Sequence, residues 1–161
     1  MKKLLFILSL VITAGCSRAQ NPPNIQKIPA YHILTNDSVY VTQANLKKNM
    51  PVVIIYFSPD CSHCQRMMYE MQPKMKELEK AQIVMITFTP YNMIKGFYRD
   101  FGLSRYPNVT VGTEGYTYQV QRYFQVKTTP YIAVYNSKGK LVKAFEKAPK
   151  VDELIATIKK A

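Results

Sequence analysis

The chain has 161 residues, which is enough for one domain with a substantial core but not comfortably for two. It carries 22 Lys and Arg against 10 Asp and Glu, so its formal net charge is +12. Such an excess can attract nucleic acid, anionic lipid headgroups or acidic proteins, but the scattered lysines fit a solvated basic surface equally well. The three cysteines are an odd number, so one of them lacks a partner.

The first 15 residues have the pattern of a signal peptide. Lys2 and Lys3 precede an apolar run over residues 4–12, and two small residues follow before position 16. This run is shorter than the roughly 20 apolar residues that span a bilayer. We therefore expect removal of residues 1–15, which takes away both lysines and lowers the net charge from +12 to +10. Since an exported protein rarely meets nucleic acid, we expect no nucleic-acid partner.

A second motif lies at the end of the signal peptide. Residues 13–16, TAGC, resemble the bacterial lipobox, which implies cleavage before Cys16 and lipid on its sulfur. Ser17 at the next position resembles the sorting signal for the outer membrane. We therefore expect a lipoprotein of the cell envelope that faces the periplasm from the outer membrane. Cys61 and Cys64 then remain as a pair.

The predicted domain covers residues 30–161 and follows a tether. Residues 16–29 include two adjacent prolines and show no apolar periodicity, which is typical of a linker. Two short strands are predicted at residues 31–34 and 38–41, on either side of an Asn-Asp turn. A short helix is expected over residues 43–48.

A strand–helix–strand unit forms the centre of the predicted domain. Residues 51–58, PVVIIYFS, are a continuous apolar run typical of a strand buried on both faces. A methionine-rich helix is expected over residues 65–82, with a kink at Pro73 because proline removes a helical hydrogen bond. Residues 83–90 form a second apolar strand. A crossover of this length predicts that the two strands are parallel.

Strands and helices continue to alternate in the second half of the domain. A turn that contains Gly139 is expected to join the two final strands as an antiparallel hairpin. The last helix has one apolar face, with which it should cover the sheet. In chain order we expect a helix over residues 93–101, a strand over 108–112, a helix over 116–123, strands over 131–135 and 141–145, and a helix over 151–160.

Cys61 and Cys64 stand where the buried strand gives way to the helix, in the stretch SPDCSHC. A helix N-terminus offers free N–H groups and partial positive charge, and both favour a thiolate. The spacing lets the two sulfurs meet in the first turn, so Cys61 can attack a disulfide and the deeper Cys64 can resolve the mixed disulfide. A protonated His63 would stabilise the Cys61 thiolate, whereas the exposed charge of Asp60 would weakly oppose it.

Metal binding is a different possible use of the two cysteines. A structural zinc site needs four ligands, and His32 and His63 are the only histidines, so we expect no such site. A copper-binding or delivery protein could combine both cysteines with neighbouring methionines as soft ligands. Packing of an amphipathic helix explains the same methionines more simply. The methionines concerned are Met67, Met68, Met71 and Met75.

Peroxidase chemistry and a purely structural disulfide are two hypotheses for the cysteines that need no metal. Ser58 lies three positions before Cys61, as a hydroxyl often does before a peroxidatic cysteine, but the nearby Cys64 favours dithiol chemistry. A purely structural disulfide is disfavoured, because closing so small a loop removes little conformational entropy from the unfolded chain. A third hypothesis is an interaction module with the same fold but without redox activity, and the sequence leaves it open.

Two segments carry a resemblance to a known family. Residues 51–64, PVVIIYFSPDCSHC, resemble the active-site strand and loop of thioredoxin-fold proteins. Residues 123–145 resemble the segment that ends in their cis-proline and opens the last hairpin. With the lipoprotein signal, the chain looks most like the exported TlpA/ResA-type thiol-disulfide oxidoreductases. The resemblance implies an α/β, thioredoxin-like fold, with a central mixed sheet flanked by helices and extra N-terminal strands.

The same resemblance implies roles for individual residues. Cys61 is the nucleophile, and Cys64 is the resolving thiol with which it forms a disulfide. Pro130 is the cis-proline that faces this disulfide, and Thr129 offers backbone groups to a bound peptide. His63 gives the dipeptide between the cysteines the character of isomerases and oxidants. The resemblance thus implies a monomeric enzyme without a cofactor, which acts on cysteine-containing exported proteins and exchanges electrons with a thiol-disulfide partner.

The sequence departs from the family where an acid is expected. Ile55 stands in the place of the buried aspartate of thioredoxins, and Met67 in the place of a glutamate of ResA-like members. The acid that usually helps Cys64 lose its proton is therefore missing, or it is Glu70 or Glu114. The direction of electron flow stays open.

Overall fold

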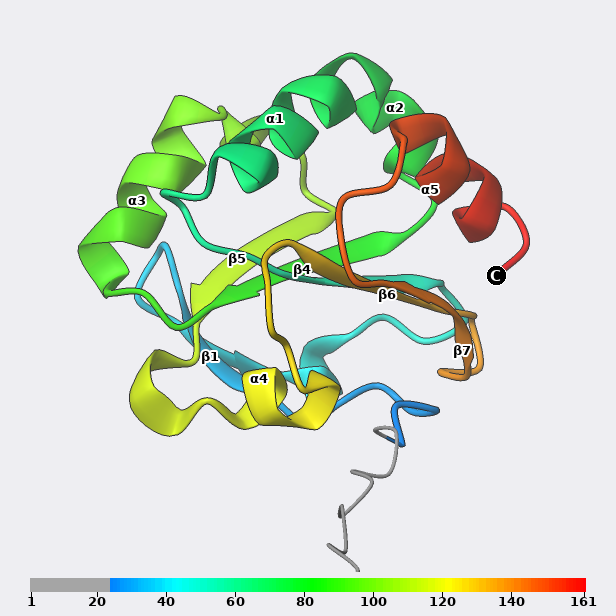
Figure 1. The fold of residues 1–161 in the computed structure, drawn as a ribbon, viewed down its shortest axis with the longest axis horizontal. Coiled ribbons are helices and arrows are strands. Elements are labelled where there is room, and N and C mark those ends of the chain that lie inside the picture. The colour runs from blue at the N-terminus through cyan, green and yellow to red at the C-terminus, as the bar shows by residue number, and fades with distance from the viewer. Residues whose placement is uncertain (1–23) are drawn as a thin grey trace, which may run out of the picture.

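A seven-stranded mixed sheet forms the centre of the molecule in a computed structural model that describes residues 24–161 (Figure 1). The strand order across the sheet is β2-β1-β5-β4-β3-β6-β7. The three central strands are parallel to one another, and every other pairing is antiparallel. The strands are β1 (His32–Thr35), β2 (Tyr40–Thr42), β3 (Val52–Tyr56), β4 (Gln82–Thr87), β5 (Val109–Thr113), β6 (Tyr131–Tyr135) and β7 (Leu141–Phe145).

Helices cover both faces of this sheet, but unequally (Figure 1). Four helices lie on one face: α1 (Ser62–Met71), α2 (Met75–Leu78), α3 (Tyr91–Asp100) and α5 (Val151–Ile158). The short helix α4 (Gln119–Phe124) lies on the opposite face. The expected mixed sheet between helices, with additional strands at its N-terminal end, is thereby confirmed.

Strand β3 is buried on both sides, as its apolar run predicts. Val53 and Ile55 enter the core beneath α1 and α5, whereas Ile54 and Tyr56 enter the core on the side of α4. Because side chains alternate along a strand, a strand that is covered on both faces needs apolar residues at every position. The pairing of β3 with β4 is parallel, so the predicted strand–helix–strand unit is confirmed.

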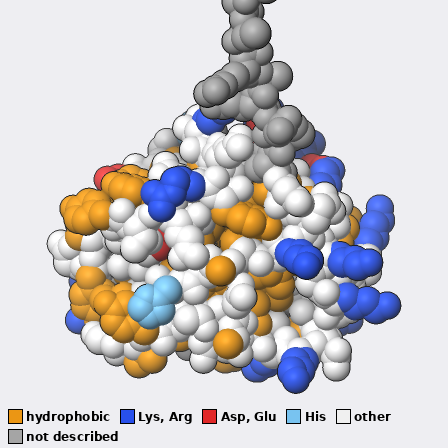
Figure 2. Space-filling view, turned by 90° about the horizontal axis from the view of Figure 1, so that it is seen from below, with side chains coloured by type: hydrophobic (Ala, Val, Ile, Leu, Met, Phe, Trp, Pro, Cys, Tyr) orange, Lys and Arg blue, Asp and Glu red, His pale blue; other side chains and the backbone are white. Residues whose placement is uncertain are grey.

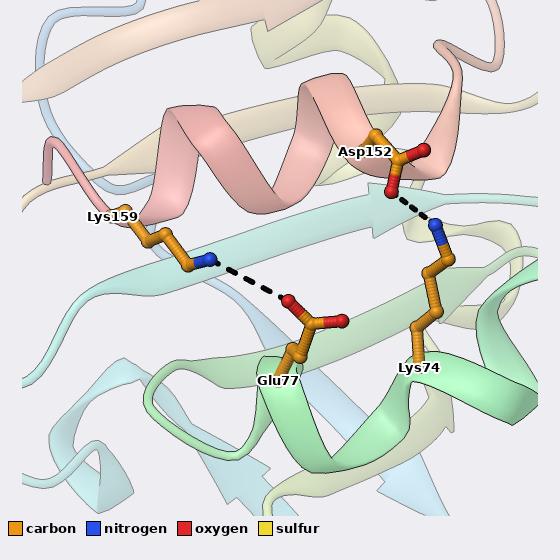
Figure 3. A network of polar contacts seen from close by, with 4 residues as sticks. All are labelled: Lys74, Glu77, Asp152 and Lys159. Atoms are coloured by element: carbon orange, nitrogen blue, oxygen red, sulfur yellow. Dashed lines mark hydrogen bonds and ion pairs between the residues drawn. The ribbon is translucent and has the colours of Figure 1, made fainter.

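The kink expected at Pro73 is present between α1 and α2. A 3₁₀ turn, Gln72–Lys74, separates the two helices, because a proline ring cannot continue the helical hydrogen-bond ladder. Helix α5 packs across this region through one buried face. Two ion pairs, Lys74–Asp152 and Lys159–Glu77, add contacts between α5 and the α2 region (Figure 3). Both pairs lie largely in solvent, so apolar burial provides most of the stabilisation there.

The helix predicted over residues 116–123 begins later than expected. A 3₁₀ turn, Gly115–Thr117, comes first, and α4 follows between Tyr118 and Gln125, two residues in left-handed conformation. The carboxylate of Glu114 accepts from the N–H groups of Val120 at 2.7 Å and Gln121 at 3.3 Å. These contacts, made by a carboxylate several residues before the helix, fix the helix start.

The end of the predicted tether packs against the folded domain. Residues 24–29 lie against the sheet edge, and Lys27 bridges Lys140 next to β7. The N–H of Leu141 donates to the carbonyl of Gln26 at 3.0 Å. Ile25 and Ile28 also pack against the core on the α4 side. Backbone pairing with an edge strand therefore orders a stretch whose sequence is typical of a linker.

Smaller differences concern the ends of elements. The helix expected over residues 43–48 is a 3₁₀ turn, Gln43–Asn45, in which Thr42 and Asn45 cap one another. Within residues 24–161 no helix is both long and apolar enough to cross a membrane. The predicted signal peptide, Cys16 and the start of the tether lie outside the described residues.

Substitution by alanine should have opposite effects on stability at two glycines, Gly112 and Gly96. A Cβ on Gly112 of β5 would come within 2.9 Å of the Ile33 Cδ1 and 3.0 Å of the Leu34 carbonyl oxygen. Gly112→Ala should therefore lower the free energy of unfolding by about 1–3 kcal/mol. A Cβ on Gly96 in α3 meets nothing within 4 Å, so Gly96→Ala should raise it by about 0.5–1 kcal/mol. Urea denaturation followed by circular dichroism measures both, and equal effects would contradict the close approach at Gly112.

Candidate active site

The two cysteines lie at the junction of β3 and α1, as the sequence predicts. Cys61 is the residue directly before α1 and has extended backbone angles, so it stands at the N-terminus of the helix. Its own N–H donates to the carbonyl of Ser58 at 3.2 Å, which closes the loop after β3. The N–H groups of the first helical turn are therefore free to face the Cys61 sulfur.

The two thiols differ in burial. Both are free thiols in this structure, and Cys61 is half-buried, whereas Cys64 is completely buried in the core on the α1 side. Only Cys61 is therefore open to a large partner. The arrangement fits the expected division into an attacking thiol and a deeper resolving thiol.

The surroundings of Cys61 favour its thiolate. Burial has the largest single effect and raises its pKa. Hydrogen bonds with Thr129 and with the Cys64 thiol, together with the backbone N–H groups of Cys64 and His63, outweigh burial and hold the pKa of Cys61 below its ordinary value. Donors directed at a sulfur stabilise its charged form, which is the expected effect of a helix N-terminus.

The pKa of Cys64 is shifted in the opposite direction to that of Cys61. Burial raises the pKa of the Cys64 thiol to about 12; the backbone of Ser58 lowers it in part, and the neighbouring Cys61 raises it. Of the two thiols, Cys61 therefore loses its proton first, while Cys64 keeps its proton at neutral pH and donates it in a hydrogen bond to the Cys61 sulfur. In such a pair, Cys61 is the nucleophile and Cys64 is a thiol that stays protonated.

His63 meets the Cys61 site through its backbone. Its side chain is exposed and makes no hydrogen bond to another described residue. Its backbone N–H, not its imidazole, contributes to the lowered pKa of Cys61. The imidazole instead lines a groove beside the cysteine pair.

Thr129 and Pro130 meet the cysteine pair across the fold. The Cys61 Sγ lies 3.4 Å from the carbonyl oxygen of Thr129, although the two residues are 68 positions apart. The Thr129–Pro130 peptide bond is cis, as the resemblance implies. Strand β6 begins directly afterwards and pairs antiparallel with β3, and this pairing brings the two motifs together.

A groove of about 630 Å³ opens next to this contact. It contains the expected residues His63, Thr129 and Pro130. The sequence did not indicate the remaining lining residues. Adjacency to Thr129 is a signal that could have indicated two of them, Lys127 and Thr128. Folding brings these residues to the groove from β3, the end of β4, α4 and the segment after β7. They are Tyr56, Phe88, Gln121, Val126, Lys127, Thr128, Lys147 and Ala148.

Neither glutamate named as a possible acid for Cys64 contacts that thiol. The side chain of Glu114 is buried on the α4 side of the sheet, where it accepts from the Tyr56 hydroxyl at 2.8 Å. Cys64 lies in the core on the other side. Glu70 is exposed on α1 and makes no hydrogen bond to another described residue. Glu114 thus supports the groove wall and α4, and no described acid takes the place missing at Ile55 and Met67.

The structure gives little support to a metal site. Among the described residues no three His, Cys, Asp or Glu side chains cluster as metal ligands. His32 stacks on Tyr40 with ring centroids 4.5 Å apart, in the β1–β2 hairpin. The candidate soft ligands Met67, Met68, Met71 and Met75 are at most 2% exposed and pack in the core. Packing therefore accounts for the methionine spacing.

The hydroxyl of Ser58 has a hydrogen-bond partner other than the Cys61 sulfur. It donates to the Asp60 carboxylate at 3.1 Å. The hydroxyl that suggested a peroxidatic cysteine thus has another partner within the same loop.

The thioredoxin-like domain family matches residues 41–161. This match covers more than half of the chain, and the chain therefore belongs to that family. No functionally curated protein sequence matches the chain. The predicted thioredoxin-like family and fold are confirmed.

Solved structures show the same fold at low sequence identity. A secreted disulfide oxidoreductase from Mycobacterium tuberculosis, homologous to E. coli DsbE, has a TM-score of 0.68 and 16% identity over 81% of this chain and 96% of its own. A peroxiredoxin-like protein from Aquifex aeolicus has a TM-score of 0.67 and 18% identity over 84% and 85%. The exposed lipoprotein thioredoxin from Streptococcus pneumoniae has a TM-score of 0.64 and 19% identity over 82% and 99%.

Alkylation of the reduced protein should distinguish the two thiols. Because the thiolate is the reacting species, Cys61 should react with iodoacetamide well below the pH of a free thiol, about 8.5. Cys64 should stay unlabelled at neutral pH, since its pKa is raised to about 12. Peptide mapping by mass spectrometry across pH measures both rates, and preferential labelling of Cys64 would reverse the assignment.

Two variants at position 63 extend this prediction. His63→Pro removes both the imidazole and the backbone N–H, whereas His63→Ala removes the imidazole alone. Proline is tolerated in the first helical turn. The alkylation midpoint of Cys61 should therefore rise in His63→Pro and stay near the wild-type value in His63→Ala. Equal rises in both variants would assign the effect to the imidazole.

Proposed function

We propose that the protein is an exported thiol-disulfide oxidoreductase that acts on disulfides or thiols of other exported proteins. The observation that supports this function best is the divided cysteine pair beside the cis-proline. A half-buried Cys61 with a lowered pKa faces Thr129, and a buried, protonated Cys64 lies behind it. Membership of the thioredoxin-like family agrees with this chemistry.

The proposed reduction proceeds in two balanced steps. The Cys61 thiolate attacks one sulfur of a client disulfide; a bond forms between Cys61 and that client sulfur, and the other client sulfur leaves as a thiolate. Cys64 then loses its proton and attacks the Cys61 sulfur. The mixed disulfide breaks, the Cys61–Cys64 disulfide forms, and two electrons have passed to the client. Oxidation of a client dithiol is the same sequence in reverse.

The second step requires a base that accepts the proton of Cys64. Burial keeps Cys64 protonated, and no described carboxylate reaches it. The leaving client thiolate is a base formed beside it during the first step, so it can accept this proton. Resolution then depends on the client, and the mixed disulfide should live longer than in a family member with a buried acid.

Removal of the resolving thiol tests the proposal. Cys64→Ala leaves Cys61 able to attack and deletes the second step, so mixed disulfides with exported cysteine proteins should accumulate on non-reducing gels. The double variant Cys61→Ala/Cys64→Ala is the control and should trap nothing. If Cys64→Ala is folded and alkylatable at Cys61 but traps no partner, thiol exchange is not its function, and soft-metal binding becomes the leading hypothesis.

The redox state in cells then gives the direction of electron flow. A stabilised Cys61 thiolate stabilises the dithiol form, which makes the disulfide more oxidising. A mostly oxidised pair at steady state would identify an oxidant or isomerase. A mostly reduced pair would identify a reductase supplied by a thiol-disulfide donor.

We also propose that the mature protein is attached to the envelope membrane through lipid on Cys16. The lipobox-like motif supports this, and the similar S. pneumoniae protein is described as an exposed lipoprotein. Several acyl chains hold a protein far more firmly than one. Cys16→Ser should therefore move the protein from the membrane pellet to the soluble fraction. Continued sedimentation of this variant after a salt wash would assign the anchoring to another part of the chain.

A further inference from the structure

The groove beside the cysteine pair is positively charged. The exposed side chains of Lys127 and Lys147 line it, and no Asp or Glu side chain does. Neither lysine forms an ion pair with a described residue. The groove beside the cysteine pair therefore holds two cations without a counter-charge in the groove itself.

Most acidic side chains of the described chain are engaged elsewhere. Glu114 is buried beneath the groove wall, and Asp60 accepts from Ser58. Glu146 lies in the neighbouring cavity, which also borders Lys127. On the surface that carries α4, basic side chains gather toward the side of β7 (Figure 2). Ion pairs away from the groove engage Glu77, Asp100, Asp152 and Glu153.

The groove also presents an apolar surface. Phe88, Val126 and Ala148 line it together with the cis-proline. Aromatic contacts continue from Phe88 to Tyr118 at 5.7 Å between centroids, and from Tyr118 to Tyr116 at 6.3 Å. Tyr116 is 82% exposed, so the aromatic row runs from the groove to open surface. Exposed aromatic side chains next to a binding groove are typical anchors for a protein partner.

We propose that this groove and aromatic row select client segments whose cysteine is flanked by acidic and apolar residues. The inference rests on the proposed oxidoreductase function and adds the chemical class of its client. Carboxylates of the client lie near Lys127 and Lys147, and an apolar or aromatic side chain packs on Phe88 and toward Tyr116. The acidic flank lies in the groove because both lysines line it, whereas Asp60, in the loop before Cys61, would repel an acidic flank.

Peptides with an activated disulfide test this selectivity. Each peptide carries one cysteine joined to thiopyridine, and the Cys64→Ala protein attacks the peptide sulfur through Cys61, so that a mixed disulfide forms and thiopyridine leaves. Its absorbance gives the second-order rate. One peptide has glutamates around the cysteine, and its counterpart has lysines at the same positions. The ratio of the two rates should favour the acidic peptide by about tenfold at low salt.

Charge reversal of the groove provides the decisive comparison. In the Cys64→Ala background, Lys127→Glu/Lys147→Glu should remove or invert the rate ratio. Lys138→Glu, an exposed lysine in the β6–β7 turn, should leave it unchanged. The intrinsic reactivity of each peptide cancels when the ratio is compared between proteins. An acid-to-base ratio that is unaffected by the groove double variant overturns the proposal.

The aromatic row has its own test. Tyr116→Ser changes a residue in open solvent, so folding should be unaffected. It should slow the reaction of acidic peptides that carry phenylalanine near the cysteine several-fold, but not that of peptides with serine there. If Tyr116→Ser changes the rates of the phenylalanine and serine peptides equally, the apolar part of the proposal is overturned. Absence of reaction with every peptide, in protein that iodoacetamide labels at Cys61, instead contradicts the oxidoreductase function itself.

Discussion

The approach of the Thr129 backbone to the Cys61 sulfur is the contact on which the whole site depends. It exists because β3 pairs with β4 on one side and with β6 on the other. The first pairing is parallel and therefore needs a crossover between the strands, which includes α1. The second pairing places the start of β6 beside the end of β3, close to the start of α1. The 3.4 Å contact thus joins the helix N-terminus, the cis-proline and the groove into one site.

Two cysteines three positions apart acquire opposite properties from this arrangement. Cys61 stands before the helix, where N–H groups and the Cys64 thiol stabilise a negative charge. Cys64 is one helical turn further and enters the apolar core, where burial disfavours the same charge. Because the buried Cys64 thiol donates to the half-buried Cys61 sulfur, each residue reinforces the pKa shift of the other. The absence of a described acid near Cys64 gives the client thiolate its proposed part in proton transfer.

The face of the sheet opposite α1 shapes the partner surface. A single buried carboxylate, Glu114, accepts from the Tyr56 hydroxyl and from two N–H groups at the start of α4. A buried carboxylate is tolerated when several donors satisfy it. It therefore holds α4 against the active-site strand and keeps the groove wall in place. The lysines and aromatic residues of the groove are displayed on this fixed support.

The sequence by itself determined the apolar strands of the sheet, the existence of α1, α3 and α5 and the position of the cysteine pair at a helix start, because periodicity and local chemistry depend on neighbouring residues. Apolar runs predicted β3 and β4, and SPDCSHC predicted a thiolate at a helix start. Tertiary structure alone decided that the Tyr56 hydroxyl meets Glu114 and that Lys127 and Lys147 line one groove. Both depend on strand pairing between segments far apart in the chain, and no local pattern encodes such a distance.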